Sequence, residues 1–357
     1  MKDQLLSRYL TYFLFLQILV VQYTSRKPEF IEKYYSNGIY PYIAASYRSS
    51  LGWIPFSVGD FFYAFFGFLI LRFFYIVIRD KFSEIRRYLL AIGATFSILY
   101  FLFQLSWGMN YYRVPLATQL HIESTSYSDE QLNKFTGKLV KELNALHLKT
   151  TQDSEQKITV PYTRKEIYKL AVNGYTHISK QHAFLNYKFP SVKHSLLSTP
   201  LTYMGFAGYL NPLTGEAQVN SKMPLPTYAF TTCHEMAHQL GFAAENEANF
   251  IGYLAAIHNE DVYFQIAGKM TALKYVLSEL RKRDLELYKL HYENINKGIL
   301  INFRESNEFW NSYENPFEPL FKKSYSTYLK ANRQKGGIKS YSYMVNLLLN
   351  YKDTQDL

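Results

Sequence analysis

The sequence TTCHEMAHQLGFAAENEANF, residues 231–250, decides how this chain is interpreted. It joins an HExxH motif at 234–238 to two further acids, Glu245 and Glu247. The apolar residues before the motif and Gly241 after it predict a buried helix that ends in a left-handed turn. A second helix is then expected to begin within a few residues and to fold back toward the histidines.

The residues of the motif are spaced for metal chemistry. On a helix, His234 and His238 are four residues apart, so both rings lie on one face and can bind the same ion. Glu235 lies about 100 degrees around the helix, where its carboxylate can hold a water molecule and act as a general base. Cys233, the immediate neighbour of His234, is expected to point away from that face and to act as a small buried apolar side chain.

The residues of the motif do not decide which side chain is the third metal ligand. The pattern HExxHxxGxxH would need a histidine at 244, where the chain has Ala244, so that class of zinc peptidase is excluded. Glu245 and Glu247 are two residues apart and point in nearly opposite directions on a helix. Only one of the two can therefore face the ion.

Three apolar segments predict that the first third of the chain spans a membrane. The chain has 357 residues, of which 48% are hydrophobic and 18% aromatic. Segments 9–23, 58–78 and 88–107 are each close to the roughly 20 apolar residues that cross a bilayer. The first lacks the small residues of a signal-peptidase site, so it is expected to stay as an uncleaved membrane helix.

The distribution of charge predicts the orientation. Four of the nine residues 79–87 are Lys or Arg, which places this loop and the amino terminus in the cytoplasm. Residues 1–112 then form a membrane anchor, and residues 113–357 form an extracytoplasmic domain. The net charge of +10 is dispersed, so no nucleic-acid surface is expected. A single cysteine excludes an internal disulfide.

The pattern after residue 112 predicts a mainly α (α+β) domain. Ser128 and Thr163 each begin a capping box, which predicts that a helix starts at each. Short segments broken by glycine and proline between 188 and 221 predict a small antiparallel hairpin. The predicted helices are 129–147, 164–182, 227–240, 246–258, 261–283 and 338–350.

Several blocks resemble a known family. The core HEMAHQLGFAAENEANFIGYL resembles the signature of the domain of unknown function 3810 family, bacterial membrane proteins with an HExxH-GFA-ExEANF core. The blocks at 54–64, 107–116, 205–220 and 328–349 also look like blocks of this family. The resemblance covers nearly the whole chain.

The resemblance implies a zinc-dependent peptidase held in the bacterial plasma membrane, with a peptide or protein substrate in the cell envelope. ENEANF is also similar to the NEA element of gluzincins, which implies that Glu247 binds zinc together with His234 and His238. Glu235 would then be the catalytic base. Glu245 would complement the helix dipole or accept a hydrogen bond from a ligating histidine.

Further roles follow as expectations. The strand near 215–222 is expected to bind an extended peptide by strand addition. Tyr341 is a candidate for stabilising an oxyanion. One alternative is a non-catalytic, membrane-tethered scaffold or sensor with a structural zinc site, which needs four protein ligands. A second alternative is a peptidase that acts within the membrane or on its cytoplasmic face.

Overall fold

The protein is almost wholly helical, with one small sheet. Its structure is a computed structural model that describes residues 2–122, 126–332, 334 and 341–351. The membrane-proximal elements are α1 (Lys2–Thr24), α2 (Pro28–Ile31), the π-helix η1 (Glu32–Ile39), α3 (Tyr40–Leu51), α4 (Val58–Arg79), α5 (Ile85–Ser106) and the 3-10 helix η2 (Gly108–Tyr112). The elements that follow are α6 (Leu116–Gln119), α7 (Asp129–Thr151), α8 (Arg164–Ile178), η3 (Ala183–Leu185), β1 (Val192–His194), α9 (Ser198–Tyr203), β2 (Gly208–Leu210), β3 (Ala217–Val219), η4 (Leu225–Thr227), α10 (Tyr228–Gln239), α11 (Glu245–Ile257), α12 (Val262–Arg283), α13 (Leu285–Glu293), α14 (Lys297–Asn311), α15 (Glu318–Ala331) and α16 (Tyr341–Asn350).

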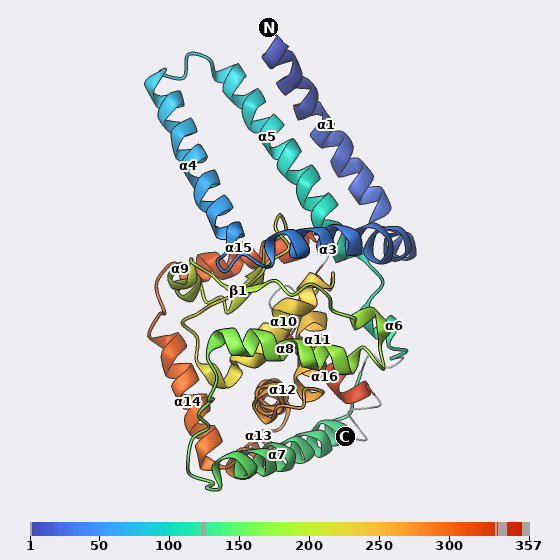
Figure 1. Cartoon of the computed structure of the whole chain (residues 1–357), viewed down its shortest axis with the longest axis vertical. Coiled ribbons are helices and arrows are strands. Elements are labelled where there is room, and N and C mark those ends of the chain that lie inside the picture. Colours follow the sequence, from blue (N-terminus) through green and yellow to red (C-terminus); the bar gives the residue numbers. More distant parts are fainter. Residues whose placement is uncertain (1, 123–125, 333, 335–340, 352–357) are drawn as a thin grey trace.

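The three predicted membrane spans are confirmed as long apolar helices. They cover Gln4–Thr24 in α1, Val58–Arg79 in α4 and Ile85–Ser106 in α5. Little of their surface is buried within the chain, as expected where lipid is the solvent. In Figure 1 the three helices project from the same side of the remaining helices. We conclude that these helices anchor the protein in a membrane, whereas its orientation stays a prediction.

The segment between the first two spans is helical and not an open loop. It forms α2, η1 and α3, and α3 lies across the membrane-side surface of the helical domain (Figure 1). Tyr40 and Ala44 of this segment pack with Trp107, Ala243 and Leu329 in a small buried apolar cluster. Part of the predicted 1–112 anchor therefore packs directly on the remainder of the chain.

The core of the helical domain surrounds α10 and α11. These two helices pack against each other, and α8, α12 and the sheet cover α10. Both predicted capping boxes are present, at Ser128 before α7 and at Thr163 before α8. The ends of the predicted helices 129–147, 164–182, 227–240, 246–258 and 261–283 agree with the observed ends to within four residues. The start of the predicted helix 338–350 lies outside the described residues. The largest fully buried side chains of this core include Tyr175, Tyr228, Phe242, Phe250 and Phe264.

The sheet confirms the predicted hairpin and adds a third strand. Its strand order is β1-β3-β2, with β3 antiparallel to β2 and parallel to β1. Because β3 has a neighbouring strand on each side, the prediction that residues 215–222 bind a peptide by strand addition is wrong. Asn211 and Asn220 donate backbone hydrogen bonds that join β2 to β3. In an antiparallel pair, every second residue of a strand bonds to its neighbour through its backbone groups. The backbone groups of Gly208 and Leu210 therefore point away from β3, toward the outer edge of β2.

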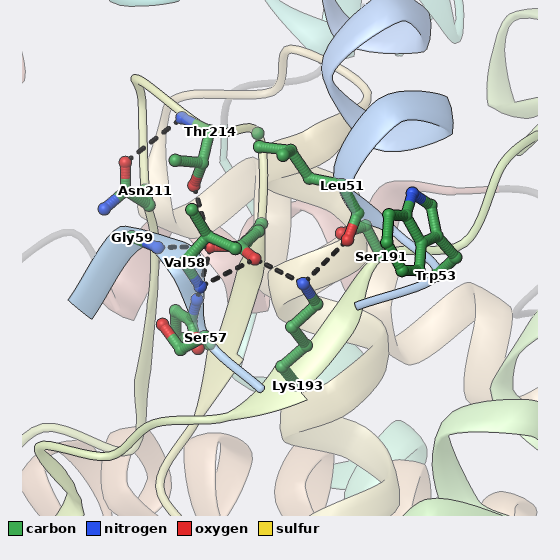
Figure 2. A network of polar contacts seen from close by, with 12 residues as sticks. Leu51, Trp53, Ser57, Val58, Gly59, Ser191, Lys193, Asn211 and Thr214 are labelled. Atoms are coloured by element: carbon green, nitrogen blue, oxygen red, sulfur yellow. Dashed lines mark hydrogen bonds and ion pairs between the residues drawn. The ribbon is translucent and has the colours of Figure 1, made fainter. Parts of the chain in front are cut away.

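A buried carboxylate ties the second span to the sheet. Glu216, which precedes β3, accepts hydrogen bonds from the amides of Val58 (3.1 Å) and Gly59 (2.6 Å) at the start of α4. Lys193 of β1 forms an ion pair with Glu216 and donates to the Leu51 carbonyl at 2.9 Å (Figure 2). A carboxylate at a helix amino terminus satisfies free amides and complements the helix dipole.

A second acid makes a similar link one residue further along α4. Asp60 accepts hydrogen bonds from the Leu196 amide (2.7 Å) and the Ser195 hydroxyl (3.0 Å). It also accepts one from the hydroxyl of Tyr209 in β2. The first turn of a membrane span is therefore fixed to two strands of the sheet.

We predict that Glu216→Ala destabilises the protein strongly, because it leaves Lys193 charged, buried and without its partner. Breaking a buried pair in this way costs about 3–5 kcal/mol, which corresponds to a fall in Tm of roughly 6–20 °C at about 2–4 °C per kcal/mol. Thermal unfolding of the full chain in detergent measures the change. Glu314→Ala, at an exposed glutamate, is the control and should leave Tm nearly unchanged.

Candidate metal centre

Helix α10 carries the HExxH motif through the middle of the core. All of its residues are buried, which is unusual for a helix with two histidines and a glutamate. Cys233 is fully buried, and its backbone carbonyl accepts a hydrogen bond from the Tyr175 hydroxyl at 2.5 Å. Burial raises the pKa of the Cys233 thiol. The prediction that Cys233 is a small buried apolar side chain is confirmed.

The end of α10 fixes the orientation of His238. The helix stops before Gly241, whose φ of +85° is the left-handed conformation that glycine adopts most easily. The turn brings the Phe242 carbonyl to 2.7 Å from His238 Nδ1. A carbonyl only accepts, so Nδ1 carries the proton and Nε2 keeps its lone pair for a metal.

Three side chains bring potential metal-ligand atoms close to one another. His234 Nε2 and His238 Nε2 are 3.1 Å apart. Glu245, the first residue of α11, places Oε2 at 3.4 Å from His234 Nε2 and Oε1 at 3.6 Å from His238 Nε2. Two ligand atoms at about 2.0–2.1 Å from a tetrahedral Zn²⁺ lie roughly 3.3–3.4 Å apart. The donor set and its spacing therefore fit a zinc ion.

The electrostatics of Glu245 suit a ligand. Burial raises the pKa of this carboxyl, but the hydrogen bond from His234 and the electrostatic interactions with both histidines outweigh that effect and hold it at about 2. The hydroxyl of Tyr325 in α15 donates to Glu245 Oε1 at 2.6 Å and favours the charged form as well. Burial lowers the pKa of His238 to about 4, which keeps its ring neutral.

Glu247, the predicted third ligand, is not brought to the histidines. Its Oε1 accepts a hydrogen bond from the Leu116 amide at 2.7 Å, and burial raises its pKa to about 7. The physical reason is the start of α11, which is Glu245 and not residue 246 as predicted. Glu245 thereby faces the histidines, and Glu247, two residues on, points away from them. Glu245, and not the Glu247 that the family resemblance implies, therefore lies beside the histidines in this structure, and the identity of the metal-binding acid stays a prediction.

Glu235 lies beside the histidines as predicted. One carboxylate oxygen of Glu235 and one ring nitrogen of each histidine lie within 4.8 Å of one another. The side chain is buried, which raises its pKa to about 8. Within the described part of the chain, Glu235 Oε2 has no hydrogen-bond partner. A buried carboxylate oxygen in that state is suited to hold a water molecule or a proton.

Residues distant in sequence complete the surroundings of the centre. The indole N–H of Trp107 donates to the His238 carbonyl at 3.3 Å, and the Tyr40 hydroxyl donates to the Gln239 carbonyl at 3.0 Å. These contacts and the Tyr325 contact had no local sequence signal, because their partners are more than 75 positions away. The side chain of Tyr341, the predicted oxyanion donor, lies outside the described residues.

The centre lies at the membrane boundary. Span α5 ends at Ser106, and the next residue, Trp107, already contacts His238, with 6.1 Å between the ring centroids. Tyr328 of α15 packs on Phe103 in the last turn of α5, with ring centroids 6.4 Å apart. In Figure 1, α15 lies at the same level as α3, directly beneath the spans.

Gly208 of β2 keeps space for the Glu235 carboxylate. A Cβ added there would collide with Glu235 Oε1 and would come within 2.7 Å of the Gln218 carbonyl oxygen. We predict that Gly208→Ala lowers the free energy of unfolding by about 1–3 kcal/mol through overpacking. Thermal unfolding in detergent measures this cost. Gly67→Ala is the matched control, because a Cβ at Gly67 has open space, and an equal cost for both variants would contradict the packing argument.

Comparisons with known proteins assign the chain to a family but do not indicate an activity. Residues 35–349 match the family described as "Protein of unknown function (DUF3810)". No curated protein and no solved structure matches the chain.

Proposed function

The chain belongs to the DUF3810 family, whose function is unknown, and we propose that it is a membrane-anchored zinc metallopeptidase. The observation that carries the proposal is the spacing of His234 Nε2, His238 Nε2 and a Glu245 oxygen at 3.1–3.6 Å, next to the buried Glu235. We assign zinc to His234, His238 and Glu245. Glu247 has a different role, since it binds the Leu116 amide.

Glu235 is the proposed general base and acid. When bound, a zinc ion would supply Lewis-acid activation of a water molecule and of a carbonyl group. Glu235 Oε2 would accept the proton of the attacking water and return it to the leaving amine. Burial raises the pKa of the Glu235 carboxyl, which favours holding the transferred proton, whereas a zinc ion beside it would favour the charged form that accepts that proton.

A peptide is the proposed substrate because β2, an edge strand of the sheet, lies beside Glu235. Gly208 of β2 is in close contact with the Glu235 carboxylate, and the backbone groups of Gly208 and Leu210 point to the outer edge of that strand. An extended peptide can pair with such an edge through main-chain hydrogen bonds. Strand addition is thus assigned to β2 in place of residues 215–222.

The location of the centre supports a substrate in the cell envelope. Trp107 is the first residue after a membrane span, and its indole N–H donates to the His238 carbonyl. A peptide segment held at the membrane surface would therefore lie near the metal centre. The basic loop at 79–87 supports placing the domain on the extracytoplasmic side of a bacterial plasma membrane.

A structural zinc site in a scaffold or sensor is the weaker alternative. Such a site is closed by four protein ligands. His234, His238 and Glu245 bring three ligand atoms within 3.1–3.6 Å of one another, and a closed site would have to take Glu235 as its fourth ligand. Glu235 would then be unavailable to act on a water molecule. We therefore favour catalysis.

The test of the proposed activity is Glu235→Gln. We expect this variant to retain one zinc per chain and to lose at least about a thousandfold in peptide hydrolysis, because it removes the base but no ligand. Zinc content is measured by elemental analysis, and hydrolysis with casein and a quenched-fluorescence peptide library in detergent. Glu314→Gln is the exposed control. Undiminished hydrolysis in Glu235→Gln would exclude this mechanism, and a wild-type protein with zinc but no hydrolysis would favour the scaffold.

The choice between the two acids has its own test. Glu245→Gln should weaken zinc binding by about a hundredfold or more, because it removes the charge that neutralises the ion. Glu247→Gln removes a carboxylate two residues away and should keep zinc affinity within a few-fold. Competition with a zinc-binding dye measures both affinities. The reverse order of the two affinities would restore Glu247 as the ligand.

A further inference from the structure

A cavity lies at the other end of the membrane spans from the metal centre. It has a volume of about 580 Å³ and lies between the first turns of α1 and the start of α5. In Figure 1 these ends are at the top, far from α10 and α11. We name it the basic cavity, because its lining includes Arg8, Arg86 and Arg87 against one acid, Glu84.

The arginines of the basic cavity are available to a ligand. Arg8, Arg86 and Arg87 are all exposed. Among the described residues, no carboxylate lies within 4 Å of any of the three as an ion pair, although Arg79 of the same loop pairs with Asp80 at 3.1 Å. Arg8 donates to the Tyr12 hydroxyl at 3.4 Å, which leaves its charge uncompensated. Three guanidinium groups without a carboxylate partner around one cavity create a positive potential that attracts an anion.

The cavity is amphipathic and lies at a bilayer boundary. Arg8 lies in the first span and Arg86 in the third, so the cavity is level with lipid headgroups. Leu5 and Leu90 supply an apolar part of the lining. A small soluble anion would leave those leucines in contact with water, whereas a lipid covers them with its glycerol and acyl region.

The walls of the cavity are held together before any ligand binds. The Thr11 hydroxyl of α1 donates to the Leu90 carbonyl of α5 at 3.1 Å. Deeper in the bilayer, the Gln17 side chain donates to the Ser97 hydroxyl at 2.8 Å. Hydrogen bonds between spans resist separation, because lipid offers no alternative partner. The spacing of the two walls is therefore fixed.

We propose that the basic cavity binds the headgroup of an anionic phospholipid. The phosphodiester would receive charge-assisted hydrogen bonds from Arg86 and Arg87, with Arg8 facing it from α1. The apolar residues would contact the start of the acyl chains. Basic pockets between spans are suited to this use, since each basic residue near the membrane surface contributes to the attraction. The site is separate from the metal centre and does not depend on the proposed peptidase activity.

The experiment measures lipid binding to the full chain in detergent by native mass spectrometry. The probes are a diacyl phosphatidylglycerol, a phosphatidylcholine with the same acyl chains, and inorganic phosphate. We expect phosphatidylglycerol to bind wild-type protein at least tenfold more tightly than phosphatidylcholine. The double variant Arg86→Gln/Arg87→Gln should bind phosphatidylglycerol roughly 10- to 30-fold more weakly, the effect of two basic residues near a membrane surface.

The matched control is Arg79→Gln/Lys81→Gln. It removes the same charge from the same loop, but neither residue lines the cavity. This control should keep the preference for phosphatidylglycerol, and unchanged Tm values should verify that both variants fold. Equal weakening in both double variants would overturn the proposal in favour of diffuse charge attraction. Binding of inorganic phosphate as tight as that of phosphatidylglycerol would overturn the assignment to a lipid.

Discussion

The turn between α10 and α11 is the constraint on which the candidate centre depends. Gly241 reverses the chain in a left-handed conformation, and the same turn brings the Phe242 carbonyl to His238 Nδ1. One short connection thereby fixes the tautomer of a histidine and returns Glu245 to the face of α10 that carries both histidines. A longer connection would lose this coupling, because the direction of α11 would no longer be set by the end of α10.

The membrane spans hold this centre from two sides. On one side, Glu216 and Asp60 join the start of α4 to the sheet that packs on α10. On the other, Trp107 and Tyr40 donate to the last carbonyls of α10. The helix with the histidines is therefore fixed relative to the bilayer, and the spans are part of the architecture of the site.

Local patterns predicted those features of the chain that local physics determines. The spans, the capping box at Ser128 and the helix with His234 and His238 follow from hydropathy, side-chain capping and helical spacing. The identity of the third acid depended on a single residue at the start of α11, which lies within the usual uncertainty of a helix end. The contact between Tyr325 and Glu245 joins residues 80 positions apart, so only the tertiary fold could reveal it. Strands of three residues likewise form because neighbours pair with them, and propensity alone does not determine them.

The surroundings shift the pKa values of the half-buried Glu245 and the buried Glu235 in opposite directions. Glu245 faces two histidines and a tyrosine hydroxyl, which hold its pKa at about 2, so it stays charged and suits a cation. Glu235 lacks such partners on Oε2, and burial raises its pKa to about 8. The different surroundings match the two proposed roles, with the charged Glu245 as a metal ligand and Glu235 as the group that exchanges a proton. A structural site that did not take Glu235 as its fourth ligand would leave the desolvation of this carboxyl uncompensated. The unequal environments of Glu245 and Glu235 therefore support the proposal that one acid binds a cation and the other exchanges a proton.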